Sequence, residues 1–188
     1  MPFSQSSQIS IILNHIEQLN PHTILDVGTG MGQYGFLMRT NLENIHLFQI
    51  EAHRGWQRPK AEWRVRIDGI EGCDVYITPV HEYCYNQLMI GDALDILPTI
   101  ADNQYELVLA IDILEHFSTN DGIIFLNHLK RIANKTALIS TPKTFIPQDV
   151  PANPYENHRS LWHQPALCEN QFTHFLENTE SWIAYYEK

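Results

Sequence analysis

The spacing of hydrophobic residues changes several times along the chain. Apolar residues recur at helical spacing in residues 7–19, whereas 23–27 and 105–111 are short, nearly unbroken apolar runs. Such runs are typical of strands that are buried on both faces of a sheet. By the same criteria, helices are expected at 7–19, 32–42, 75–85 and 121–133, and strands at 23–27, 65–70, 87–90, 105–111 and 136–140. Strands and helices in alternation predict a three-layer α/β/α fold around a mostly parallel sheet.

Other segments interrupt this alternation. Residues 44–50 are compatible with a strand or an extended loop, and 51–62 have no clear period, so we expect an insertion there. Residues 144–162 are rich in proline and of mixed polarity, which predicts a long loop. The last apolar segments, 172–176 and 182–186, are expected to pair as a hairpin. A hairpin after parallel strands departs from the usual dinucleotide-binding arrangement.

The composition is that of a globular protein, and we expect one domain that spans residues 1–188. Hydrophobic residues make up 44% of the chain and charged residues 18%, which argues against a disordered chain. The three cysteines are an odd number and form no CxxC pair, so neither a disulfide framework nor a zinc knuckle is predicted. The chain offers no signal peptide and no apolar stretch of membrane-spanning length. These features predict a cytoplasmic protein without a membrane partner.

The charge balance argues against a nucleic-acid partner. The formal net charge is −10, and binding to a phosphate backbone requires a basic surface. One local group of basic residues nevertheless occurs in and after the expected insertion, and it is compatible with a solvated surface segment or with a subsite for an anionic substrate. Its members are Arg54, Arg58, Lys60, Arg64 and Arg66.

A glycine-rich turn after the first expected strand has the strongest chemical signal. Gly28, Gly30 and Gly32 alternate with other residues between that strand and the next helix. Ligands of open α/β sheets bind in the crevice at this position. Glycines allow a tight turn and a close approach of the ligand to the backbone, and the first N–H groups of the helix attract an anionic group. Gly28, Thr29, Gly30 and Gly32 are therefore candidate cofactor-binding residues.

The same turn also contains a GxGxxG pattern from Gly30 to Gly35, which is found in proteins that bind nicotinamide or flavin dinucleotides. This pattern alone is weak evidence. Asp26 lies two residues before the first glycine, where its carboxylate would repel a pyrophosphate but could pair with a cationic amino-acid group. Asp26 therefore favours a ligand without phosphates.

Acidic residues recur at the ends of the later strands. Glu71 could accept hydrogen bonds from both hydroxyl groups of a ribose. Glu51 is the alternative, since it lies nearer to the usual distance from the glycine-rich turn, but the spacing of Glu71 from Asp92 matches one strand–helix repeat. The Asp92 carboxylate could accept from an adenine amino group while the Ala93 N–H donates to a ring nitrogen, and Asp92 could also cap the next helix.

Directly after the most apolar strand, residues 112–116 read Asp-Ile-Leu-Glu-His. Asp112 is expected beside the reacting part of the ligand, and Glu115 and His116 are candidates for a general base. Glu115 and His116 could also bind a metal ion, but the sequence indicates no third ligand, so no metal is predicted.

Together, these residues resemble the class I S-adenosylmethionine-dependent methyltransferases, over about 24–142. The segment 24–32 resembles the first motif of that family, Glu71 its ribose-binding acid, 91–93 its adenine-contacting motif, and 112–117 the fourth-strand motif of its small-molecule enzymes. The resemblance implies a Rossmann-like fold with a seven-stranded sheet whose C-terminal strand is antiparallel. It also implies S-adenosylmethionine as the cofactor, held by Asp26, Gly28, Thr29, Gly30, Gly32, Glu71, Asp92, Ala93 and Asp112. The long path between 44 and 64 and the short chain after residue 162 differ from the usual pattern of the family.

The segment 153–162 is dense in polar and aromatic residues and follows the fifth core strand. It is similar to segments of bacterial methyltransferase-like proteins whose substrates are unassigned, and it is expected to form a lid or acceptor loop or, alternatively, an ordered surface loop. His158 is the candidate base in it. The expected activity is methyl transfer to a small molecule or a glycan precursor. There are three alternatives. The protein could bind the cofactor without catalysis, it could be a nicotinamide-dependent oxidoreductase, or it could use another nucleoside, as an aminopropyl transferase does.

Overall fold

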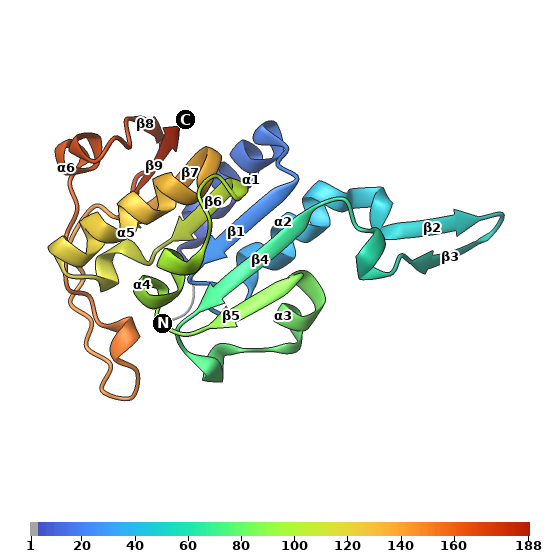
Figure 1. Ribbon diagram of the computed structural model, residues 1–188, viewed down its shortest axis with the longest axis horizontal. Helices are drawn as coiled ribbons and strands as arrows, with labels where there is room; N and C mark the ends of the chain where they lie inside the picture. Colours follow the sequence, from blue (N-terminus) through green and yellow to red (C-terminus); the bar gives the residue numbers. More distant parts are fainter. Residues whose placement is uncertain (1–3) are drawn as a thin grey trace.

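The computed structural model describes residues 4–188 (Figure 1). Its main sheet has seven strands within this range, in the order β5-β4-β1-β6-β7-β9-β8. The strands are β1 (Thr23–Val27), β4 (Arg66–Glu71), β5 (Gln87–Ile90), β6 (Tyr105–Ile111), β7 (Ala133–Pro142), β8 (His174–Leu176) and β9 (Ser181–Glu187). The pairs from β5 to β7 are parallel, and β9 is antiparallel to both β7 and β8. The expected fold class, including the antiparallel strand near the C-terminus, is confirmed.

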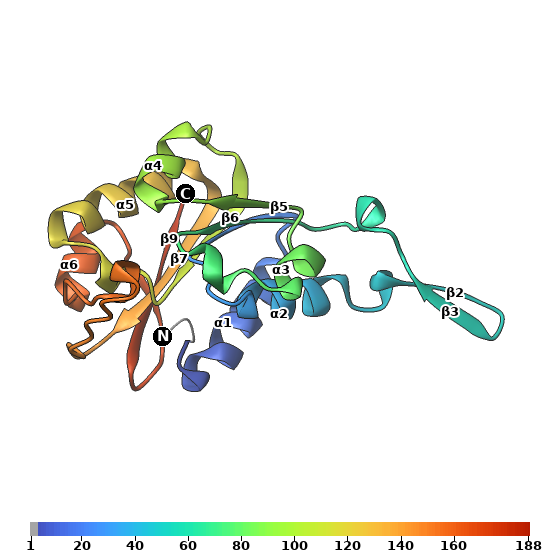
Figure 2. The ribbon, with the colours of Figure 1, turned by 90° about the horizontal axis from the view of Figure 1, so that it is seen from below.

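Helices cover both faces of the sheet (Figure 2). The helices are α1 (Ser6–Leu19), α2 (Gln33–Glu43), α3 (Pro79–Cys84), α4 (Ala93–Ile96), α5 (Thr119–Ile132) and α6 (Gln164–Glu169). The apolar side chains of α1 to α3 pack in one core, and those of α4 to α6 pack in the other. Apolar residues from alternate positions of β1 enter opposite cores, Ile24 one and Leu25 the other, because successive side chains of a strand point to opposite faces.

The segment expected as an insertion forms a hairpin outside the main sheet. After the 3₁₀ turn η1 (Asn44–Leu47), β2 (Phe48–Glu51) pairs with β3 (Arg54–Gln57) in antiparallel register. The hairpin projects beyond α2, and another 3₁₀ turn, η2 (Lys60–Glu62), leads back to β4 (Figure 1). Part of the expected insertion is therefore regular structure.

The helix expected at 75–85 is shorter than its apolar pattern suggested. The 3₁₀ turn η3 (Asp74–Tyr76) comes first, and α3 begins only at Pro79. Thr78, directly before Pro79, forms a capping box with His81. The cap and the proline together fix the start of the helix, because proline favours the first helical turn.

The two ends of the described chain meet at α1. The Ser7 hydroxyl donates to the Glu180 carboxylate over 2.5 Å, and the Asn178 side chain donates to the Ser7 carbonyl over 3.2 Å. Glu180 and Asn178 lie in the turn between β8 and β9. None of the described helices is both long and apolar enough to cross a membrane.

Candidate active site

A cavity of about 530 Å³ opens at the carboxyl ends of β1, β4 and β6. This volume is within the range of about 300–1,000 Å³ that is usual for small-ligand pockets. Candidate cofactor residues that line it are Asp26, Gly28, Thr29, Gly30, Glu71, Asp92, Ala93 and Asp112. Most of the candidates from the sequence are therefore brought together by the fold.

Glycines allow the backbone to turn sharply at the base of the cavity. Gly28 has φ +80°, and a Cβ there would lie 2.7 Å from the Ile113 side chain. The N–H groups of Gly28 and Thr29 both donate to the Ile70 carbonyl, at 2.9 and 3.1 Å, which ties the turn to β4. Gly32, also left-handed at φ +85°, is the N-cap of α2 and is not among the lining residues.

Glu71 joins the end of β4 to the glycine-rich turn. Its Oε2 accepts from the Gly30 N–H at 2.7 Å and from the Thr29 hydroxyl at 3.2 Å, and its Oε1 accepts from the Cys73 N–H at 2.9 Å. A carboxylate has about four acceptor positions, two on each oxygen, so Oε1 keeps capacity for a ligand. Burial raises the pKa of Glu71, while these hydrogen bonds oppose the shift.

Asp26 is buried at the end of β1. Its Oδ2 accepts from the Tyr85 hydroxyl at 2.6 Å, and burial raises its pKa to about 7. Gly35 leaves room for this tyrosine, since a Cβ at Gly35 would overlap the Tyr85 ring. The last glycine of the GxGxxG pattern therefore has a packing role that the sequence did not reveal.

The cap expected at Asp92 is confirmed. Its Oδ1 accepts from the Leu94 N–H at 2.8 Å at the start of α4. Asp92 and Ala93 also line the cavity, so the cap and a contact with the ligand are compatible roles.

Asp112 has a left-handed backbone conformation, with φ +52°, which is uncommon for a residue other than glycine. Several side chains hold it in place: Gln8 donates to Oδ2 at 2.5 Å, and Ser140 donates to Oδ1 at 2.7 Å. Gln8 comes from α1 and Ser140 from β7, so two distant elements fix this carboxyl. No pattern in the sequence connected Gln8 with the site.

Tyr34 is another residue that the sequence analysis did not select. It lines the cavity, and its buried hydroxyl has no hydrogen-bond partner in the described part of the chain. Burial and the nearby Asp112 and Asp26 carboxyls raise its pKa, so Tyr34 is a neutral donor. A buried hydroxyl without a partner costs free energy, and a ligand could supply the missing acceptor.

The loop after β7 covers one side of the cavity. Asn153, Tyr155 and Arg159 are among its lining residues. The Asn153 side chain donates to the Tyr76 hydroxyl at 3.0 Å, across the cavity from β7. At the end of the loop, Trp162 is buried. The loop therefore forms an ordered wall of the cavity, and its role as an acceptor loop stays a prediction.

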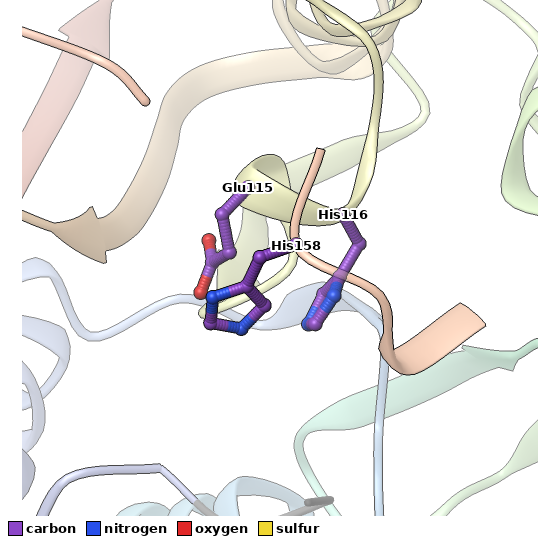
Figure 3. Close-up of side chains that lie close together, drawn as sticks. All are labelled: Glu115, His116 and His158. Atoms are coloured by element: carbon purple, nitrogen blue, oxygen red, sulfur yellow. The ribbon is translucent and has the colours of Figure 1, made fainter. Parts of the chain in front are cut away.

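The three candidate bases lie together on this side (Figure 3). A ligand atom of each of Glu115, His116 and His158 lies within 4.8 Å of those of the other two. His116 lines the cavity, whereas Glu115 and His158 are not among its lining residues. Burial lowers the pKa of both histidines and raises that of Glu115 to about 8.

Two alternatives from the sequence lie elsewhere. Glu51 is the last residue of β2, in the projecting hairpin (Figure 1), and is not a lining residue. Of the two candidate acids for the ribose, only Glu71 lies at the cavity. The basic group that starts at Arg54 is also absent from the lining. Arg64 instead donates to the Leu42 carbonyl at the end of α2, and Arg66 pairs with Asp68.

The cavity is strongly acidic. Its lining contains six carboxyl groups, those of Asp26, Glu71, Asp92, Asp112, Asp121 and Glu156, and one guanidinium, that of Arg159. Such a lining favours a cationic ligand and opposes a pyrophosphate.

Comparison with solved structures identifies the fold. The chain is similar to S-adenosylmethionine-dependent methyltransferases from Aquifex aeolicus, at 14% identity over 97% of this chain and 93% of that chain with a TM-score of 0.58, and from Archaeoglobus fulgidus, at 11% identity over 95% and 94% with a TM-score of 0.58. It is also similar to the 1,6-didemethyltoxoflavin-N1-methyltransferase of Burkholderia thailandensis, solved with its substrate and S-adenosylhomocysteine, at 15% identity over 95% and 76% with a TM-score of 0.59. No protein-family profile and no curated protein matches the sequence. The chain has the class I methyltransferase fold.

Proposed function

We propose that the protein binds S-adenosylmethionine and transfers its methyl group to a small molecule or a glycan precursor. The observation that carries this proposal is the acidic lining of the cavity at the carboxyl ends of the parallel strands. The cofactor has a sulfonium, an ammonium and a carboxylate but no phosphate, so its charges suit this lining better than those of a dinucleotide. The fold supports the same choice.

The lining residues fit the parts of this cofactor. Glu71 would accept from a ribose hydroxyl, because its Oε1 retains an acceptor position. Asp92 and Ala93 would contact the adenine, and Asp26 would pair with the ammonium group. Tyr34 would donate its hydroxyl hydrogen to the bound molecule, which supplies an acceptor for a group that has none in the described residues.

When bound, the cofactor supplies an electrophilic methyl group. The main task of the chain is then to hold donor and acceptor in line and to exclude water. The loop from Asn153 to Trp162 would form the acceptor side of the cavity. A hydroxyl or ammonium acceptor also has to lose a proton, and His116 is the candidate base that lines the cavity, with a lowered pKa that keeps its imidazole neutral.

The test is calorimetric titration with S-adenosylhomocysteine, with NADH as the comparison ligand. We expect the nucleoside to bind and NADH not to bind. Glu71→Gln should weaken binding by about tenfold or more, since it removes a charged acceptor. Glu51→Gln is the matched control on the hairpin and should bind like the wild type.

The outcomes separate the alternatives. Binding of NADH instead of the nucleoside would reject the proposal in favour of an oxidoreductase. Binding of the nucleoside with no transfer to any compound in a panel of hydroxyl and amine acceptors would favour a binding protein without catalysis.

A further inference from the structure

Glu115, His116 and His158 come together from two separate segments. Glu115 and His116 belong to the 3₁₀ turn η5 (Leu114–His116) that follows β6, and His158 belongs to the loop after β7. In Figure 3 the Glu115 carboxylate and the His116 ring flank the His158 ring. The rings of His116 and His158 are 5.0 Å apart, edge to face. The fold therefore places beside Glu115 and His116 a third side chain that could bind a metal ion, which the sequence did not indicate.

The backbone holds these two segments in a fixed relation. The Glu115 carbonyl accepts from the N–H groups of Arg159 and Ser160, the two residues that follow His158, at 2.8 and 3.1 Å. The His158 N–H in turn donates to the Gln148 carbonyl at 3.0 Å. The three side chains are thus brought together by main-chain hydrogen bonds that do not depend on them.

Each side chain also has a partner that orients it. The His116 Nδ1 lies 3.3 Å from the Asn157 carbonyl, and since a carbonyl only accepts, Nδ1 carries the proton and Nε2 keeps its lone pair. His158 likewise hydrogen-bonds to the Ile146 backbone, and the Thr141 hydroxyl donates to Glu115 at 3.0 Å. Metal-binding histidines and carboxylates are commonly held in this way by outer hydrogen bonds.

Glu115 is also a buried carboxyl. It is 4% exposed, and no ion pair joins it to another residue in the range 4–188. A buried carboxyl without a cationic partner favours its protonated, neutral form. A metal ion bound between it and the two imidazoles would stabilise the carboxylate form instead.

We propose that Glu115, His116 and His158 bind one divalent transition-metal ion, such as Zn²⁺ or Mn²⁺. Two imidazoles and a carboxylate suit first-row transition ions, whereas Mg²⁺ prefers a shell of oxygens. Bonds of about 2.1 Å to a tetrahedral ion place the ligand atoms about 3.4 Å apart. Separations of up to 4.8 Å would then have to shorten by up to about 1.4 Å on binding.

Three protein ligands leave at least one coordination position open. Because His116 also lines the cavity, the ion would lie at its acceptor side. At that position the ion would favour an acceptor with a hydroxyl group, an inference that rests on the proposed function. Since the His116 Nε2 would then be bonded to the ion, His116 would not act as the base. The bound hydroxyl would lose its proton to solvent, its oxygen would bond to the methyl carbon, and the carbon–sulfur electron pair would remain on sulfur.

The experiment measures metal binding directly. The full-length protein is stripped with a chelator and dialysed, then titrated with Zn²⁺, Mn²⁺ and Mg²⁺ in a calorimeter. We expect one Zn²⁺ or Mn²⁺ per chain and no uptake of Mg²⁺. His116→Ala, His158→Ala and Glu115→Gln should each weaken binding by more than about 100-fold, and Thr141→Val, which removes only the outer hydrogen bond, by about tenfold.

His163→Ala is the matched control, because His163 is exposed at the start of α6 and lies outside the cluster. It should bind metal like the wild type. Circular dichroism identifies any variant that does not fold, and His158→Ala changes only a loop residue. The proposal is overturned if the wild type takes up no stoichiometric ion, or if the three ligand variants bind as tightly as it does.

Titration of the same samples with S-adenosylhomocysteine separates the two proposals. Nucleoside binding without metal uptake rejects the metal site alone. Metal uptake without nucleoside binding rejects the proposed function alone.

Discussion

The Tyr85 hydroxyl donates a hydrogen bond of 2.6 Å to Asp26, so a tyrosine that follows α3 holds the carboxyl at the end of β1. Both side chains are buried. The hydrogen bond opposes the rise that burial causes in the Asp26 pKa. The charge that the proposed site presents to an ammonium group thus depends on a residue 59 positions away in the sequence.

The binding of S-adenosylmethionine should depend on pH because of this carboxyl. The pKa of Asp26 is raised to about 7, and a cationic ligand prefers the ionised form. We expect the affinity to fall as the pH is lowered from 8 to 6, by up to about tenfold per unit below the pKa. Calorimetry at several pH values, in buffers with different ionisation enthalpies, should detect proton release near pH 7. A flat profile in the wild type would contradict this assignment.

The same carboxyl should destabilise the ligand-free protein at high pH. Burial raises the pKa of Asp26 in the folded protein above the usual value of an aspartate, so the unfolded chain loses the proton first as the pH rises. The contribution to the free energy of unfolding therefore decreases between about pH 4 and 7. Asp26→Asn should raise the melting temperature at pH 8 while it weakens cofactor binding. A lower melting temperature for this variant would count against a destabilising charge.

Removal of the Tyr85 hydroxyl should shift this pH dependence upward. In Tyr85→Phe, Asp26 loses the hydrogen bond that opposes the rise of its pKa. We expect weaker binding at pH 7, recovery at higher pH, and a loss of about 1 kcal/mol in the free energy of unfolding. Denaturant unfolding and calorimetry at pH 7 and 8.5 test these expectations. If Tyr85→Phe binds the nucleoside as tightly as the wild type at both pH values, Tyr85 does not act through Asp26.

Gly28→Ala should damage the site more than a typical surface substitution. Gly28 has φ +80°, and a new Cβ would lie 2.7 Å from the Ile113 side chain. We expect a loss of about 1–3 kcal/mol in stability and a large loss of nucleoside affinity, measured by denaturation and calorimetry. Gly55→Ala, on the hairpin, is the control, because its Cβ would have only ordinary contacts at 3.8 Å.

Gly122→Ala should destabilise the protein although alanine favours helices. Gly122 lies within α5, where helix propensity alone predicts a gain of about 1 kcal/mol. A Cβ there would overlap the Trp162 ring, which is buried at the end of the loop that lines the cavity. We therefore expect a lower melting temperature in thermal unfolding, and an increase would show that Trp162 adjusts without cost.

Local signals in the sequence were sufficient to predict most of the helices and strands of the fold. Apolar runs located β1 and β6 because strands in a parallel sheet are buried on both faces. The hairpin of β2 and β3 was not recognised, because its side chains are largely exposed and leave no hydrophobic period. The start of α3 was misplaced, since the cap at Thr78 overrides the apolar pattern before it.

The site was predictable where its residues lie at strand ends. Glu71, Asp92 and Asp112 reach the cavity for that reason alone. Tyr34, Tyr85 and Gln8 were missed because only tertiary packing brings their polar atoms to the site. The same holds for His158 as a proposed metal ligand, since it is far from Glu115 in sequence and near it only through the loop.

The hydrogen bond between Ser7 and Glu180 links residues 173 positions apart, and Gln8, which holds Asp112, is next to Ser7. Contacts between residues so far apart in sequence form slowly, because the loop between them has to close first. We therefore expect the Asp112 side of the cavity to form late in folding and to be among the first parts to open in the folded protein. A ligand that fills the cavity would then slow hydrogen exchange in this part of α1, because it stabilises the closed state. Exchange rates there would therefore measure both local opening and ligand binding.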